Sequence, residues 1–194
     1  MSLALRIAAA LAEPDRGDPE RDDWGLPIET FSPAAVLIAI TDRPEPGVLL
    51  TLRNASLRRH AGQIAFPGGR VDPGDAGPID AALREAEEEI GLPRAAVEIA
   101  GISDVFHIGS GFEIVPVIGV VPPDLPLVPH EAEVASVFET PLAFLFDPDN
   151  RVRREAQFQG HSRRYYEIMW EDRRIWGATA AIIVNLARRL RTVA

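Results

Sequence analysis

Three glutamates, Glu85, Glu88 and Glu89, are spaced so that a helix would place them on one face. At about 100° per residue, positions i, i+3 and i+4 lie close together. Like charges at i, i+4 destabilise an isolated helix by roughly 0.2 to 0.5 kcal/mol per pair. Mg²⁺ prefers oxygen ligands and is often held by carboxylates together with the phosphates of a substrate. The spacing therefore indicates either a divalent cation site or a solvated acidic face on a surface helix.

The residues around the acidic run supply the elements that would position these carboxylates. Gly68 and Gly69 form a turn ahead of the helix, and Gly91 with Pro93 ends it. The helix is two-sided, because an apolar stripe lies beside its acidic face. We expect this stripe to dock on a sheet, and it consists of Ile79, Leu83, Ala86 and Ile90.

The run REAEEEIGL, residues 84–92, resembles the signature helix of the Nudix hydrolases, and Gly69 matches the glycine that opens that family's box. One position departs from the family pattern. Where the family usually has Glu just after the turn, this chain has Asp75, and the gap from Asp75 to Arg84 is one residue longer than usual. A short carboxylate just before a helix caps or orients the turn. The resemblance favours the cation site over the solvated face.

Upstream, LLTLRNASLRRHAGQIAFPGGRVD, residues 49–72, resembles the motif of the coenzyme A pyrophosphatase branch of this family. Members of that branch carry this kind of Asp and lengthened box. Asn54 departs from the motif, where the branch usually has Ser or Thr, but each of these side chains can hydrogen-bond a turn. The later runs GFEIVPVIG, EVASVFETPL and IWGATA also resemble the branch. The resemblance therefore extends over nearly the whole chain.

The resemblance implies metal-dependent hydrolysis of the diphosphate linkage of coenzyme A or its derivatives. The products would be 4'-phosphopantetheine, or its acyl form, and adenosine 3',5'-bisphosphate. Mg²⁺ or Mn²⁺ is the implied cofactor, and a small-molecule nucleotide is the implied partner. The metal ligands that it implies are the Gly69 carbonyl and the carboxylates of Glu85, Glu88 and Glu89.

Further roles follow from the family's chemistry and from residue type. Arg84 would orient a glutamate by a charge-assisted bond, or else only neutralise the helix. The proton of the attacking water needs a carboxylate, for which the catalytic candidates are Glu85, Glu88, Glu131 and Glu133. Arg53 and Arg58 belong to the branch motif and could bind phosphates. Phe112 is a candidate for lining the substrate pocket, with a buried strand-start aromatic as the alternative.

Two other functions remain open at this point. A Nudix hydrolase of another nucleoside diphosphate derivative, such as ADP-ribose or NADH, is the nearer alternative, because the box cleaves the linkage without recognising adenine or pantetheine. A non-catalytic Nudix-like ligand sensor is the more distant one. The intact set of Arg84, Glu85, Glu88 and Glu89 argues against a sensor, which has no need of every carboxylate.

Composition restricts the partners of the protein. The net charge of −9 gives no basic field for nucleic acid or an anionic membrane, so we expect neither as a partner. Lys is absent, so every cationic side chain that contacts a phosphate must be a guanidinium or an imidazolium. Cys is absent as well, which excludes disulfides and thiolate chemistry. A cytoplasmic enzyme is the simplest interpretation, and a homodimer is compatible with the sequence.

The predicted elements indicate an α/β protein, a Nudix-type α/β/α sandwich with a mixed β-sheet. The 194 residues suffice for one core, so we expect an N-terminal helix and charged connector over residues 1–24 and a single domain over residues 25–194. Apolar patterns predict strands at 34–40, 47–53, 64–66, 97–106, 113–121, 134–139 and 164–170, the last pairing near 156–158. Helices are predicted at 2–12, 80–90, 141–146 and 177–190.

Overall fold

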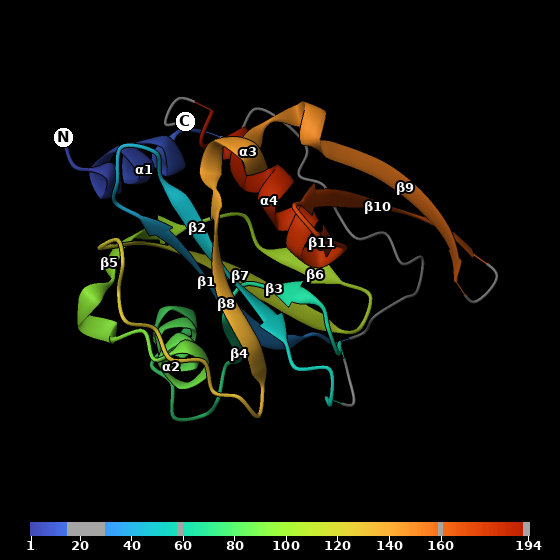
Figure 1. Ribbon diagram of the computed structural model, residues 1–194, viewed down its shortest axis with the longest axis horizontal. Coiled ribbons are helices and arrows are strands. Elements are labelled where there is room, and N and C mark those ends of the chain that lie inside the picture. The colour runs from blue at the N-terminus through green and yellow to red at the C-terminus, as the bar shows by residue number, and fades with distance from the viewer. Residues whose placement is uncertain (15–29, 58–59, 159–160, 192–194) are drawn as a thin grey trace.

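The computed structural model describes residues 1–14, 30–57, 60–158 and 161–191 (Figure 1). Within these ranges, eight strands form one mixed sheet and three form a smaller antiparallel sheet. The helices are α1 (Leu3–Ala12), α2 (Pro78–Ile90), α3 (Leu142–Phe146) and α4 (Ala178–Arg189), with 3₁₀ turns η1 (Arg94–Ala96) and η2 (Pro148–Asn150). The strands are β1 (Ser32–Thr41), β2 (Gly47–Arg53), β3 (Ile64–Ala65), β4 (Gly68–Arg70), β5 (Glu98–Ile102), β6 (Phe106–Ile108), β7 (Phe112–Val121), β8 (Val134–Pro141), β9 (Arg151–Phe158), β10 (His161–Trp170) and β11 (Arg173–Trp176).

The large sheet is split in its centre. β1 runs parallel to β7 along its whole length, but the register of β1 with the antiparallel β2 is given by a single pair, Ile40 with Val48. On its other edge β2 pairs with β8 along its whole length, and its end also pairs with β3, while the first half of β1 pairs with the short β4. The split therefore lies between β4 and the end of β2, at the strand ends that carry Gly69 and Arg53.

One face of the large sheet is covered by α2, which packs through small residues. Ala81, Ala82, Ala86 and Ile90 are buried against β1 and β7, and the alanines let the helix lie close to the strands. The predicted apolar stripe was partly wrong, because Ile79 is 37% exposed and Leu83 is only half-buried. The buried face is rotated toward Glu89, a carboxylate that the sequence pattern assigned to the polar side.

The opposite face is covered by α1, α3 and α4 (Figure 1). Ile7 of α1 and Ile183 of α4 lie in the same apolar cluster as Ile38 and Ile118 of the sheet. With helices on both faces of a mixed sheet, the predicted α/β/α sandwich is confirmed. Arg189 of α4 also donates to the carbonyl oxygens of Leu11 and Glu13, which joins the two ends of the described chain.

The smaller sheet has the order β11-β10-β9, and its β9–β10 hairpin projects away from the body of the molecule (Figure 1). Its root is anchored, because Ile168 and Ile175 are fully buried in the core that α4 covers. The pairing of β9 with β10 was predicted, although both strands are longer than expected. Strand β11 was not predicted as a separate element.

Candidate active site

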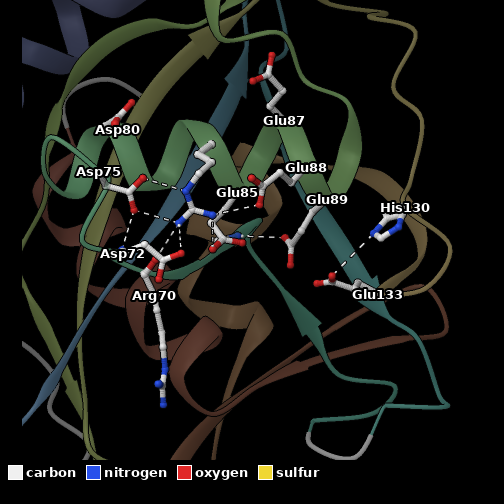
Figure 2. A network of polar contacts seen from close by, with 12 residues as sticks. Arg70, Asp72, Asp75, Asp80, Glu85, Glu87, Glu88, Glu89, His130 and Glu133 are labelled. Atoms are coloured by element: carbon white, nitrogen blue, oxygen red, sulfur yellow. Dashed lines mark hydrogen bonds and ion pairs between the residues drawn. The ribbon is translucent and has the colours of Figure 1, made fainter.

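Arg84 stands at the centre of a group of carboxylates on the first turns of α2. Its Nε donates to Asp75 Oδ1 at 2.9 Å and its Nη2 to Asp75 Oδ2 at 3.0 Å, a bidentate pair. Its Nη1 donates to Glu85 Oε1 at 3.0 Å and to Glu88 Oε2 at 3.1 Å. Figure 2 shows the three acidic side chains converging from the turn and the helix. One guanidinium thus fixes two of the predicted metal ligands.

Asp75 is a buried anchor for this arginine. Its side chain is 4% exposed and also accepts a hydrogen bond from the Asp72 amide at 2.7 Å. The hydrogen bonds from Arg84 and from that amide lower the pKa of Asp75 to about 2, and the same pair raises the pKa of Arg84. The sequence predicted that Asp75 caps or orients the turn. It did not predict the ion pair with Arg84, because nine residues separate the two in the chain and no spacing rule brings their side chains together.

Glu89 is the most buried of the glutamates on α2, with a side chain only 5% exposed. Its Oε2 accepts from the Gly68 amide at 3.1 Å, and its Oε1 lies 3.6 Å from Arg53 Nη1. Burial raises the pKa of Glu89 to about 7, against the lowering effects of the Gly68 amide and Arg53. The Gly68 amide and Arg53 therefore do not fully offset the cost of burying the Glu89 charge, and a bound cation would stabilise the ionised carboxylate further.

Gly69 lies against Glu85, and its lack of a side chain is what permits the contact. A Cβ at this position would overlap the Glu85 carboxylate. Burial raises the pKa of Glu85, while the bond from Arg84 lowers it. The Gly69 backbone and the Glu85 side chain, both of them predicted metal ligands, are therefore close neighbours.

Glu133 approaches the cluster from the segment before β8. Its charge is among the causes that raise the pKa of both Glu85 and Glu89, and Figure 2 places it on the Glu89 side of the helix. The backbone of its segment is tied to α2, because the His130 amide donates to the Glu89 carbonyl at 2.8 Å. His130 Nδ1 lies 3.8 Å from the Glu133 carboxylate. The side chain of Glu133 remains half exposed.

Asn54 holds the same segment from the other side. Its backbone N–H donates to the Glu133 carbonyl at 2.8 Å, and its side-chain Nδ2 donates to the Glu131 carbonyl at 2.7 Å. Its Oδ1 accepts from the Ser56 amide at 2.9 Å, which is the turn role expected of this residue. The departure from the branch motif thus retains its turn bond and also links β2 to the Glu133 segment.

The predicted substrate-binding residues fall in different places. Arg53 lies at the end of β2 beside Glu89. Phe112 begins β7 on the other face of the sheet, where its half-buried ring lies under the Arg70 guanidinium at 5.2 Å. Arg58 lies outside the described residues. Arg70 was not predicted at all, since one arginine in a turn carries no spacing signal.

The donor set fits a hard divalent cation. All of its candidate ligands are carboxylate or carbonyl oxygens, and the cation beside the buried Glu89 in the described part of the chain is Arg53, at 3.6 Å. Within the described residues, no three acidic or histidine side chains already surround a common point. Glu85 and Glu88 both turn toward Arg84.

A mixed sheet between helices carries clustered glutamates beside a glycine turn. The NUDIX domain family model matches residues 31–158. The chain belongs to the Nudix family, whose members hydrolyse nucleoside diphosphate derivatives and generally use divalent metal ions.

Similar proteins agree with this assignment. The chain is 47% identical to the uncharacterized Nudix hydrolase NudL of Escherichia coli K12 over 157 residues, which cover 81% of this chain and 82% of that protein. The crystal structure of the Nudix hydrolase RenU from M. smegmatis shares 25% identity at a TM-score of 0.51, covering 66% and 81% of the two chains. A MutT/nudix protein of Enterococcus faecalis has a TM-score of 0.50 at 18% identity, covering 87% and 69%, which shows the fold alone.

In the described ranges, no helix combines the length and the apolar character that crossing a bilayer would require.

Proposed function

We propose that this Nudix hydrolase cleaves the diphosphate linkage of coenzyme A or its derivatives, to give 4'-phosphopantetheine or its acyl form and adenosine 3',5'-bisphosphate. The observation that carries the proposal is the position of the motif in residues 49–72. Arg53 and Gly68–Gly69, which lie in the two described parts of this motif, contact the carboxylates of α2. A motif that marks a substrate branch thus borders the residues that would perform the hydrolysis.

Glu85, Glu88 and Glu89, with the Gly69 carbonyl, would hold Mg²⁺ or Mn²⁺. The bound ion supplies charge neutralisation for the diphosphate oxygens and makes water a better nucleophile. Arg84 restricts the orientations of Glu85 and Glu88, because it bonds to both and is itself locked by Asp75. This arrangement gives Arg84 a positioning role in addition to neutralising the helix.

Hydrolysis adds water across a P–O–P bond, so one proton must leave the attacking water. Glu133 is our preferred acceptor among the candidates. It is half exposed, it lies beside the Glu85 and Glu89 charges, and Asn54 holds the backbone of its segment. Glu85 and Glu88 are less suited, because Arg84 already bonds to their carboxylates.

Arg53 would bind a phosphate oxygen of the substrate. Its Nη1 forms an ion pair with Glu89 at 3.6 Å, while its Nε is buried and has no hydrogen-bond partner among the described residues. A phosphate would give this guanidinium a second anionic partner. Arg58 is proposed for the same task from its place in the motif. Homodimer formation and a cytoplasmic location remain predictions.

The test is a substrate panel with purified protein and Mg²⁺ or Mn²⁺. Coenzyme A, an acyl-CoA, dephospho-CoA, ADP-ribose, NADH and a nucleoside triphosphate are compared, with the products separated. We expect kcat/KM for coenzyme A to exceed that for ADP-ribose or NADH at least tenfold, a difference of about 1.4 kcal/mol in transition-state binding. A preference for ADP-ribose or NADH would replace the coenzyme A assignment by the wider Nudix one. Saturable binding without any hydrolysis would indicate the sensor.

A further inference from the structure

Arg70 is an exposed arginine beside the acidic cluster that no carboxylate neutralises. Within the described residues, its guanidinium has no ion pair or hydrogen bond, and its contact is the Phe112 ring at 5.2 Å. The other described arginines near α2 are each paired with at least one carboxylate. Arg84 bonds to three carboxylates, Arg94 pairs with Asp80 and Glu87, and Arg53 faces Glu89. In a chain of net charge −9, such a cation is available to an anionic ligand.

The backbone around Arg70 is fixed, although its side chain is exposed. β4 pairs with β1 through Ala34 with Arg70 and Ala35 with Gly69. The Arg70 carbonyl also accepts from Arg84 Nη2 at 3.1 Å. Arg70 is therefore attached directly to the guanidinium that orients the candidate metal ligands.

Gly69 and Arg70 of β4 face opposite sides of the sheet. Successive residues of a strand point to opposite faces, so Gly69 faces Glu85 while Arg70 faces away. Figure 2 shows the Arg70 side chain leading away from Glu85 and Glu89. An extended arginine side chain reaches roughly 6 Å from its Cα, by standard bond lengths. Arg70 is thus placed for a part of the substrate beyond the scissile diphosphate.

One aromatic ring, that of Phe112, lies on the same face of the sheet as Arg70, because Phe112 and Arg70 pair with Ser32 and Ala34 of β1. Phe31 and His107, whose ring centroids are 4.6 Å apart, lie on the other face with Glu113, which is bonded to His107 at 2.9 Å. The Glu113 carboxylate therefore points away from Arg70. The position offers one free guanidinium and one aromatic ring, which together suit an anionic group better than an uncharged pantetheine arm.

We propose that Arg70, supported by Phe112, binds the 3'-phosphate at the nucleotide end of the substrate and so determines specificity for coenzyme A over dephospho-CoA. This inference rests on the proposed function. A phosphate monoester is a dianion that a planar guanidinium can grip with two N–H groups. The contact with the Phe112 ring, 5.2 Å from the guanidinium carbon, restricts the Arg70 side chain, which lowers the entropy lost on binding.

The first experiment compares the two substrates in wild type and Arg70→Ala. We expect the variant to lose tenfold to a hundredfold in kcat/KM for coenzyme A, mainly through KM, because a hydrogen-bonded charged contact is lost. For dephospho-CoA the change should stay within about threefold, so the wild-type preference disappears. Arg70→Lys should keep part of it, since the charge remains without the planar fork.

Arg173→Ala is the matched control, because Arg173 is also stacked on an aromatic ring, that of Phe138 at 4.5 Å. It removes the same side chain from β11, away from the cluster, and should leave the preference unchanged. Arg58→Ala is the competing assignment. If it abolishes the preference while Arg70→Ala does not, or if Arg70→Ala impairs both substrates equally, the proposal for Arg70 is wrong.

A binding measurement separates this inference from the proposed function. Calorimetry compares adenosine 3',5'-bisphosphate with AMP, in wild type and in Arg70→Ala, without any need for turnover. Tighter binding of the bisphosphate by wild type, lost in Arg70→Ala, would support the site even if coenzyme A were not hydrolysed. Equal binding of the two nucleotides by wild type would overturn the site even if coenzyme A were the best substrate.

Discussion

Asp75 holds Arg84 with both of its carboxylate oxygens, at 2.9 and 3.0 Å, across a separation of nine residues. The pair joins the turn after β4 to the second turn of α2. Because Arg84 also bonds to Glu85 and Glu88, the position of the turn is transmitted to two candidate metal ligands. A carboxylate that contacts no substrate can thereby control the geometry of the site.

Replacing Asp75 by Asn tests this control. The variant removes the charge but keeps the size, so Arg84 should lose its anchor and turn more strongly to Glu85 and Glu88. We expect kcat to fall about tenfold to a hundredfold, as for residues that orient metal ligands, with a higher Mg²⁺ requirement. Steady-state kinetics over a Mg²⁺ titration measure both. Asp80→Asn, which changes a carboxylate paired with Arg94, is the control, and equal effects would contradict the anchoring role.

Glu89→Gln should leave the fold intact, because the side chains are nearly isosteric, and should remove most of the hydrolysis. Loss of one ligand of the catalytic ion is expected to cost about a thousandfold in kcat, or roughly 4 kcal/mol. The matched control is Glu87→Gln on the same helix, whose carboxylate pairs with Arg94 on the outer side. Turnover that is unchanged in Glu89→Gln at saturating Mg²⁺ would exclude Glu89 as a ligand.

The stability of the metal-free protein should depend on pH through Glu89. Its folded-state pKa of about 7 lies above the ordinary value of 4.5, so the folded state binds the proton more tightly. Protonated Glu89 therefore contributes up to about 3 kcal/mol to the free energy of unfolding. This contribution is fully present below about pH 4.5 and is lost as the pH rises through about 7. Urea unfolding in EDTA at pH 5 and pH 8 measures the loss.

Glu89→Gln supplies the reference for that measurement, because it cannot titrate. The difference in unfolding free energy between the two pH values should be smaller in the variant than in wild type. Saturating Mg²⁺ at pH 8 should restore stability to wild type more than to the variant, since the ion binds the folded state. Identical pH dependence in the two proteins would show that burial of Glu89 does not shift its titration.

Two adjacent glycines should respond differently to alanine. A Cβ at Gly68 would overlap the Ala35 carbonyl and crowd the Val36 backbone, which cannot move without disturbing β1. Gly68→Ala should therefore destabilise the fold by about 1 to 3 kcal/mol. A Cβ at Gly69 meets only the end of the Glu85 side chain, so Gly69→Ala should lower kcat while keeping the melting temperature nearly unchanged. The reverse pattern in melting curves and kinetics would contradict this assignment of roles.

The sandwich was predictable because apolar runs and turn residues mark most of its strands and helices. Less was predictable for α2, where the apolar stripe was expected at Ile79, Leu83, Ala86 and Ile90, of which Ala86 and Ile90 are buried. Burial instead follows the alanines, because a close approach to β1 and β7 favours small side chains over large ones. The same rotation buries Glu89, which no hydropathy pattern assigns to an interior.

For the site, spacing along one helix was enough to group Glu85, Glu88 and Glu89 in the sequence. Contacts between distant segments were not accessible in this way. Asn54 with the Glu133 segment, Arg70 with Phe112 and Asp75 with Arg84 depend on how strands and turns meet. The roles of Arg53, Arg58 and Glu133 remain predictions for the experiments above.

The split between β1 and β2 divides the site into two halves, each supported by a different pair of strands. Gly69 and Arg70 belong to the half built on β1, whereas Arg53 and Glu133 belong to the half built on β2 and β8. Substitutions that alter the width of this gap would shift Arg53 against Glu89 while leaving Glu85 seated on Gly69. Relatives of this enzyme could therefore diverge in the molecules they select without rebuilding the chemistry they perform.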